Sequence, residues 1–211
     1  MASAVDAVLV AVLLLNFFLL GVSRLRAVIQ GVAVQGGALG SLVLLGHGSV
    51  SARLVVLAAG TVLIKGLLIP RLLTRAMREA SIRREVEPIV GYVPSLLLGG
   101  LATGAALVFA RSLPLAEEHQ GSLLVPASLA TVLVGFILIT TRRKAISLVV
   151  GYLVLENGIF ILGMGLLEAM PFLVEIGVLL DLFVCVFAMG IMIHHISREF
   201  STLDSLSHLK E

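Results

Sequence analysis

The chain has 211 residues, of which 59% are hydrophobic and 13% are charged, and its mean hydropathy is +1.12. A water-soluble domain of this length has too little interior to bury so much apolar surface, so the composition excludes a soluble globular protein. The formal net charge is only +2, and no basic surface with interleaved aromatic residues is evident, which excludes nucleic-acid binding.

Seven apolar runs follow one another along the chain, each close to the ~20 residues that a helix needs to cross a bilayer. They cover residues 3–22, 27–46, 53–73, 92–110, 122–141, 145–167 and 173–195. The first run begins with Asp6 and no lysine or arginine, so we expect a retained helix rather than a cleaved signal peptide. The sequence therefore predicts an all-α integral membrane protein, a single transmembrane domain over residues 1–211 with about seven transmembrane helices.

The basic residues between these runs predict the orientation in the membrane. The segments after the first, third, fifth and seventh runs hold twelve of the 15 lysines and arginines. The opposite segments hold only Arg53 and Arg111, and Lys65 lies within a run. Lysine and arginine concentrate in cytoplasmic loops, so we expect the N-terminus outside and the C-terminus in the cytoplasm.

A short internal similarity suggests a duplication. The segment RLRAVI at residues 24–29 resembles RRKAIS at residues 142–147, and each joins two apolar runs. Parallel repeats are common in membrane transport proteins. We therefore expect two three-helix units, residues 1–91 with their cytoplasmic loop and residues 122–211 with their cytoplasmic tail, joined by a linker helix and outer loop over residues 92–121.

Three ionisable residues lie well inside apolar runs: Lys65, Glu156 and Asp181. A charge at the centre of a lone helix costs about 2.5–3.5 kcal/mol on insertion scales, so these side chains must face protein or water, form pairs or become neutral. Pro70 has no N–H to donate to the carbonyl of Gly66, which frees that carbonyl beside Lys65. The pattern predicts a proton or ion relay through these three residues, and an ion pair that only orients helices is the alternative.

Further polar residues extend this pattern. Tyr152 lies one turn before Glu156, Glu175 lies near the outer end of the seventh run, and His194 and His195 lie at its cytoplasmic end. We expect these four to belong to the relay or to its rim. Asn16, Gln30 and Gln35 either extend a polar path or hydrogen-bond neighbouring helices.

The sequence contains no pattern of a self-contained catalyst. It has no nucleophile–base pair, no phosphate-binding loop and no cluster of cysteines or histidines, and its single cysteine, Cys185, lies in an apolar run. We therefore expect no enzyme activity of the chain on its own, no cofactor and no metal. The segment at residues 74–88 mixes arginine with glutamate, which suits either an anionic lipid surface or a cytoplasmic partner subunit.

The segments GYLVLENGIFIL (residues 151–162), PFLVEIGVLLDLFVCVFAMGIM (171–192), STLDSLSHLKE (201–211) and LIKGLLIPRLL (63–73) resemble the E subunit of hydrogenase-4-type complexes, or HyfE-like proteins. The last three spans are similar to the small three-helix subunit of respiratory complex I (NuoK) and of multisubunit sodium/proton antiporters (MrpC). That subunit carries a carboxylate in its second span and, in complex I, one in its third. Glu156 and Asp181 fall near the corresponding places, although the second-span carboxylate aligns one turn earlier, near Leu153.

The resemblance implies a non-catalytic membrane-arm subunit of a complex-I-like oxidoreductase, such as a group 4 nickel–iron hydrogenase or formate hydrogenlyase, in a prokaryotic plasma membrane. It implies redox centres in a soluble arm made of partner subunits, antiporter-like subunits as membrane neighbours, and coupling of redox chemistry to proton or sodium translocation. Two alternatives remain open. One is an antiporter-like or inorganic-carbon-uptake assembly without a hydrogenase, and the other is a purely structural assembly subunit.

Overall fold

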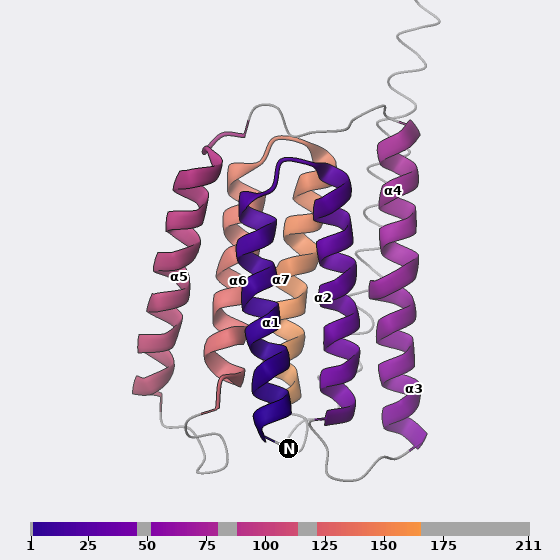
Figure 1. Ribbon diagram of the computed structural model, residues 1–211, viewed down its shortest axis with the longest axis vertical. Helices are drawn as coiled ribbons and strands as arrows, with labels where there is room; N and C mark the ends of the chain where they lie inside the picture. Colours follow the sequence, from indigo (N-terminus) through magenta and orange to yellow (C-terminus); the bar gives the residue numbers. More distant parts are fainter. Residues whose placement is uncertain (1, 46–51, 80–87, 114–121, 166–211) are drawn as a thin grey trace, which may run out of the picture.

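The computed structural model describes residues 2–45, 52–79, 88–113 and 122–165, and within these ranges every regular element is a helix. The elements are α1 (Ala2–Gly21), α2 (Leu25–Leu45), α3 (Ala52–Thr61), the π-helical η1 (Val62–Leu68), α4 (Ile69–Glu79), α5 (Tyr92–Ser112), α6 (Leu124–Thr141) and α7 (Ala145–Gly165). Figure 1 shows them side by side as an up-and-down bundle in which α5 lies at one edge and α3–α4 at the other.

The all-helical membrane fold predicted from the sequence is confirmed. Five of these helices, α1, α2, α5, α6 and α7, are long and apolar enough to cross a membrane. Large apolar side chains cover the outside of the bundle, for example Leu14, Leu101 and Val108, as expected for a surface that faces lipid. The seventh predicted span, residues 173–195, lies outside the described residues, so the count of seven and the duplication stay predictions.

The third predicted span consists of α3, η1 and α4, which follow one another without interruption. At the end of η1 the N–H of Ile69 donates to the carbonyl of Ile64, five residues earlier, which is the π-helical pattern. Pro70 follows directly and has no N–H, so the usual hydrogen bond to Gly66 cannot form. The wide turn therefore stands where the proline prevents a regular α-helix, and it contains Lys65.

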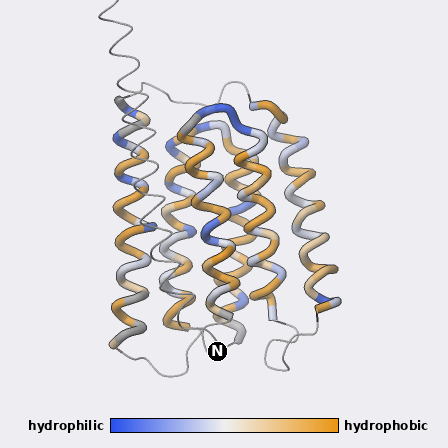
Figure 2. Tube along the Cα trace, turned by 180° about the vertical axis from the view of Figure 1, so that it is seen from behind, coloured by the Kyte–Doolittle hydropathy of each residue, from blue (hydrophilic) through white to orange (hydrophobic). Residues whose placement is uncertain are grey.

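Two apolar clusters divide the core by height. The upper cluster, toward the α1–α2 turn, includes Leu19, Ile29, Leu73, Leu138 and Val150. The lower cluster consists of Leu9, Val12, Leu39, Leu42, Ala127 and Ile161. Between the two clusters, each of α1, α2, α6 and α7 contributes buried polar side chains, among them Asn16, Gln35, Thr131 and Asn157. Figure 2 shows the same division, with a blue hydrophilic patch at mid-height in a largely orange bundle.

Glycines bring α6 and α7 into close contact. A Cβ atom on Gly135 would lie 2.5 Å from the backbone nitrogen of Leu155, and one on Gly158 would lie 2.6 Å from that of Val132. Gly151 faces Ile139 at similarly short range. Membrane helices associate largely by such close backbone packing, so these glycines determine how near α7 lies to α6.

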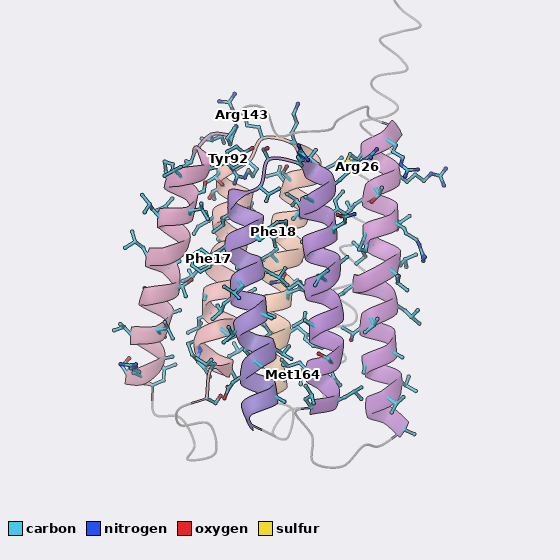
Figure 3. All side chains as sticks on the ribbon, in the orientation of Figure 1. Phe17, Phe18, Arg26, Tyr92, Arg143 and Met164 are labelled. Atoms are coloured by element: carbon cyan, nitrogen blue, oxygen red, sulfur yellow. The ribbon has the colours of Figure 1, made fainter. Side chains whose placement is uncertain are left out.

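The basic residues of the predicted cytoplasmic segments gather at one end of the bundle. Arg26 and Arg143 lie at the top in Figure 3, where α2 and α7 begin. The exposed arginines of α4 lie toward the same end, whereas Arg111 lies at the last turn of α5, at the opposite end. The arrangement agrees with the sequence-based topology, although which end faces the cytoplasm stays a prediction.

That orientation can be tested by cysteine labelling in a Cys185→Ser background. We expect a membrane-impermeant maleimide to label Ser112→Cys in intact cells, because the end of α5 should lie outside. Arg143→Cys should react only after permeabilisation. Both wild-type side chains are exposed, so burial does not explain a difference. The opposite labelling pattern would invert the topology.

Candidate functional site

Six buried polar side chains from five helices meet between the two apolar clusters, and we call this set the polar layer. Its members are Asn16 of α1, Gln35 of α2, Lys65 of η1, Thr131 of α6, and Glu156 and Asn157 of α7. Each is at most 3% exposed. Burial of polar groups is costly unless they find partners, so the contacts within the layer decide its properties.

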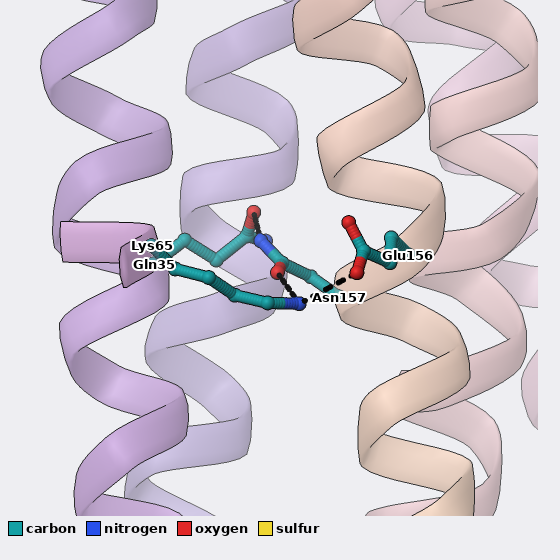
Figure 4. Close-up of polar contacts among 4 residues, drawn as sticks. All are labelled: Gln35, Lys65, Glu156 and Asn157. Atoms are coloured by element: carbon teal, nitrogen blue, oxygen red, sulfur yellow. Dashed lines mark hydrogen bonds and ion pairs between the residues drawn. The ribbon is translucent and has the colours of Figure 1, made fainter. Parts of the chain in front are cut away.

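Lys65 is the centre of the layer's charged part (Figure 4). Its Nζ lies 3.4 Å from Glu156 Oε1 and donates a hydrogen bond of 3.2 Å to Asn157 Oδ1. The same ammonium lies 5.3 Å from the centre of the Phe160 ring, within cation–π range. The two carboxylate oxygens of Glu156 accept no hydrogen bond from any residue that the structure describes. Glu156 is thus held by charge, and Asn157 by a hydrogen bond.

A line of hydrogen bonds leads away from this pair across the bundle. Asn157 Nδ2 donates to Gln35 Oε1 over 3.1 Å, and Gln35 Nε2 donates to Asn16 Oδ1 over 2.9 Å. Asn16 Nδ2 then donates to Thr131 Oγ1 over 2.8 Å, and that hydroxyl donates to the carbonyl of Ala127 over 2.7 Å. The orientation of each amide follows from these partners.

Small residues place Lys65 against α2. A Cβ atom on Gly36 would lie 2.7 Å from Lys65 Cβ and 2.9 Å from its carbonyl carbon. Gly40, one turn later on α2, faces Val62 and the carbonyl of Ala58 in the same way. The G-x-x-x-G spacing is typical of closely packed membrane helices. Close packing here brings the lysine side chain toward Asn157, the residue that also hydrogen-bonds Gln35.

The structure brings together two of the three predicted relay residues, Lys65 and Glu156. The third, Asp181, lies outside the described residues, as do Glu175, His194 and His195. Tyr152 is half-buried and packs against the upper cluster. Among the described residues no hydrogen bond joins it to the polar layer. The relay role of all these residues stays a prediction.

Sequence reasoning assigned no role to Asn157 or Thr131. Asn157 could have been identified from the sequence, because its amide directly follows a carboxylate within an apolar run. Thr131 could not, because threonine is common in membrane helices. Of the amide residues left open between a polar path and interhelical hydrogen bonds, Asn16 and Gln35 make interhelical hydrogen bonds. Gln30 is exposed.

A second buried cation, Arg142, lies at the charged end of the bundle. It is 5% exposed and donates to the carbonyl of Leu20 over 2.7 Å and to that of Val90 over 3.4 Å. Its guanidinium also lies 4.7 Å from the centre of the Tyr92 ring. These contacts join the ends of α1 and α6 to the start of α5. The neighbouring Arg143 is exposed, and nothing in the sequence separates the two roles.

Chemically, the polar layer contains one titratable pair and four groups that do not titrate at physiological pH. Lys65 and Glu156 can exchange a proton, whereas amides and a hydroxyl orient and satisfy their neighbours. No group of three histidine, cysteine, aspartate or glutamate side chains that could hold a metal occurs in the part of the chain that the structure describes. The geometry therefore suits charge pairing or proton transfer.

Comparison with known proteins assigns the chain to a family. No protein-family model matches the chain, and no solved structure matches it. The uncharacterized protein Rv0085 of Mycobacterium tuberculosis is 34% identical over 193 residues, which cover 89% of this chain and 87% of that protein. The chain belongs to the Rv0085 family.

More distant similarity links this Rv0085-family chain to a second protein. Hydrogenase-4 component E from Escherichia coli is 29% identical over 154 residues, which cover 72% of this chain and 70% of that protein, and the Shigella flexneri protein matches to the same extent. The resemblance to that subunit read from the sequence is thus supported as a distant relationship. The similarity of the last three spans to NuoK and MrpC stays a prediction for the Rv0085-family chain.

Proposed function

We propose that this chain is a membrane subunit of a complex related to hydrogenase-4, and that its buried ion pair helps couple redox chemistry in partner subunits to proton or sodium movement. Support comes from the distant relationship to hydrogenase-4 component E and from five helices able to cross a membrane. The observation that carries the coupling role is the Lys65–Glu156 pair, which lies between two apolar clusters at the middle of the bundle.

A proton moves at little electrostatic cost within such a pair. Transfer from Lys65 Nζ to Glu156 Oε1 converts an ammonium and a carboxylate into an amine and a carboxylic acid. The pair has zero net charge in both states, so no uncompensated charge is left in the apolar interior. Glu156 also has acceptor capacity that no described residue uses. These features suit a group that receives a proton from one side and releases it to another.

The proposal assigns the redox centres to a soluble arm of partner subunits and places antiporter-like subunits beside this chain. It places the complex in a prokaryotic plasma membrane, with the N-terminus outside. The chain itself would be non-catalytic. Buried ionisable residues within membrane helices generally mark ion pathways or pair with one another, and coupling uses both properties.

A purely structural role is the second candidate, and one observation favours it. Four of the six residues in the polar layer cannot titrate, and their hydrogen bonds connect α1, α2, α6 and α7. A layer of this kind could orient helices without moving any ion. The two candidates differ in whether Glu156 must be able to bind a proton.

Glu156→Gln separates the two roles, because glutamine keeps the shape and hydrogen-bonding capacity of the side chain but does not titrate. We expect the variant complex to assemble, in a reduced amount because the ammonium of Lys65 loses its ion pair. Per assembled complex it should lose at least about tenfold of its proton-coupled activity, as for removal of a proton-transferring group. Glu156→Asp should retain more activity. The assay is pH-gradient formation in membrane vesicles, with the complex quantified by immunoblotting.

The same membranes test the subunit assignment. A tagged chain, purified in mild detergent, should retain redox-active and large membrane partners that mass spectrometry identifies. A chain that purifies alone at full yield would contradict membership in such a complex. Parental pumping by Glu156→Gln would leave the structural role, and loss of the complex from the membrane would indicate that the charge pair serves assembly.

A further inference from the structure

The hydrogen bonds of the polar layer all point in one direction. Starting from Lys65, each group accepts a hydrogen bond from the residue before it and donates to the residue after it, through Asn157, Gln35, Asn16 and Thr131. The last donation is to the carbonyl of Ala127. An ammonium can only donate and a carbonyl can only accept, so both ends impose the same direction on the groups between them.

We propose that Asn157, Gln35, Asn16 and Thr131 form a polarised chain that couples the contact between α1 and α6 to the positive charge on Lys65. They are positioning residues, and they act through the lysine. The inference rests on the contacts within the polar layer and does not depend on the partners assigned above. It gives a role to the four residues of the layer that proton transfer does not use.

The physical basis is cooperative polarisation. In a low-dielectric interior each hydrogen bond strengthens the next, so a chain of them responds as a unit. A formal charge at one end orients every amide along the chain. When Lys65 is neutral, the bias from that end is lost, and only the carbonyl of Ala127 still favours this direction for the amides of Asn157, Gln35 and Asn16. The hydrogen bond that joins α1 to α6, from Asn16 to Thr131, then weakens although neither residue touches the lysine.

Asn157, the residue after Glu156, connects the charged pair to the polarised chain of hydrogen bonds. Lys65 reaches the chain through Asn157 Oδ1, whereas Glu156 makes an ion pair and accepts no hydrogen bond from a described residue. The adjacent residues Glu156 and Asn157 on α7 therefore have different roles. Glu156 balances the charge of Lys65, and Asn157 transmits it toward α2 and α1.

The alternative is a set of independent interhelical hydrogen bonds, each of local effect. Hydrogen bonds between membrane helices make individually small contributions to stability, and substitutions at sites with no shared partner combine additively. Lys65 and Asn16 are separated by two intervening side chains, Asn157 and Gln35. Independent bonds therefore predict additive effects at positions 65 and 16, and a polarised chain predicts a strong departure from additivity.

A double-mutant cycle on the purified full-length chain tests this difference. The readout is the thermal unfolding midpoint in mild detergent for the parent, Asn16→Leu, Lys65→Met and the double variant. In the Lys65→Met background the chain of hydrogen bonds has lost its terminal charge. There we expect Asn16→Leu to shift the midpoint by less than roughly half of the shift that it causes in the parent. In a Lys65→Arg background, which keeps the charge and the donors, Asn16→Leu should retain its full shift.

The matched control is Ser128→Ala. Ser128 lies one turn before Thr131 on α6, is fully buried, and donates to the carbonyl of Val125 within its own helix. Its shift should be the same with and without Lys65→Met. Additive shifts for Asn16→Leu and Lys65→Met would overturn the proposal, and so would equal non-additivity for Ser128→Ala, which would indicate general loosening.

If Asn16→Leu or Lys65→Met does not fold, milder substitutions can replace them in the cycle. Thr131→Val removes the far end of the chain with little change of shape, and Lys65→Gln neutralises the lysine but keeps a polar group. With these variants too, non-additive midpoint shifts support the polarised chain, and additive shifts overturn it. Because the cycle needs no partner subunit and no redox assay, additive shifts would leave the proposed function standing, and loss of coupling activity in Glu156→Gln would not by itself support the polarised chain.

Discussion

Lys65→Met should destabilise the protein by about 3–5 kcal/mol, the usual cost of removing one partner of a buried ion pair. Lys65 and Glu156 lie 3.4 Å apart, and their side chains are 3% and 4% exposed. Without the ammonium, the carboxylate of Glu156 has no compensating charge among the described residues. The double variant Lys65→Met/Glu156→Gln should recover most of this loss, because neither side chain is then charged.

Thermal unfolding in mild detergent measures both variants, and immunoblotting of membranes measures how much protein accumulates. Arg143→Met is the matched control, since it removes a cation from an exposed position and should change stability by no more than about 0.5 kcal/mol. Equal stability of the single and double variants would show that an uncompensated carboxylate on Glu156 does not cause the loss. A double variant less stable than Lys65→Met would show that Glu156 is held by other groups.

Gly135→Ala should produce the second large effect. The added methyl carbon would lie 2.5 Å from the backbone nitrogen of Leu155 and 2.6 Å from its Cα. Backbone atoms cannot rotate away as a flexible side chain does, so α6 and α7 must separate. Overpacking of this kind costs about 1–3 kcal/mol, and a lower unfolding midpoint measures it.

Gly104→Ala is the matched control on α5, because a Cβ atom there meets nothing within 4 Å. Alanine has the higher helix propensity by about 1 kcal/mol, so this variant should be as stable as the parent or more stable. Gly163→Ala gives the same comparison on α7, where the space is also open. If Gly135→Ala unfolded at the same temperature as these controls, the close contact between α6 and α7 would be wrong.

Much of the fold follows from the sequence alone, because the length and apolarity of a run are local properties. The run predicted over residues 92–110 is α5, Tyr92–Ser112, and that over 122–141 is α6, Leu124–Thr141. The run predicted to end at residue 73 continues as α4 to Glu79, since Leu73 and Met77 are buried on one face while arginines occupy the other. The sequence also marked Lys65 and Glu156 as unusual, because charges within apolar runs are rare.

Only the tertiary structure showed which of two adjacent residues is buried or makes the contact. Arg142 is buried and Arg143 is exposed. Gly36 contacts Lys65, whereas the adjacent Gly37 meets nothing within 4 Å. Asn157, the residue after the carboxylate, hydrogen-bonds both Lys65 and Gln35.

The physical reason lies in the solvent. In water, the polar face of a helix marks the outside, so the periodicity of the sequence indicates which residues are buried. In a bilayer the lipid is as apolar as the protein core, and α1, α6 and α7 are apolar on nearly every side. The sequence by itself therefore determined where the five described membrane-spanning helices are, and that Lys65 and Glu156 need an environment other than lipid. Close packing at glycines and the satisfaction of buried polar groups decided how the helices are rotated, and so which polar residues meet.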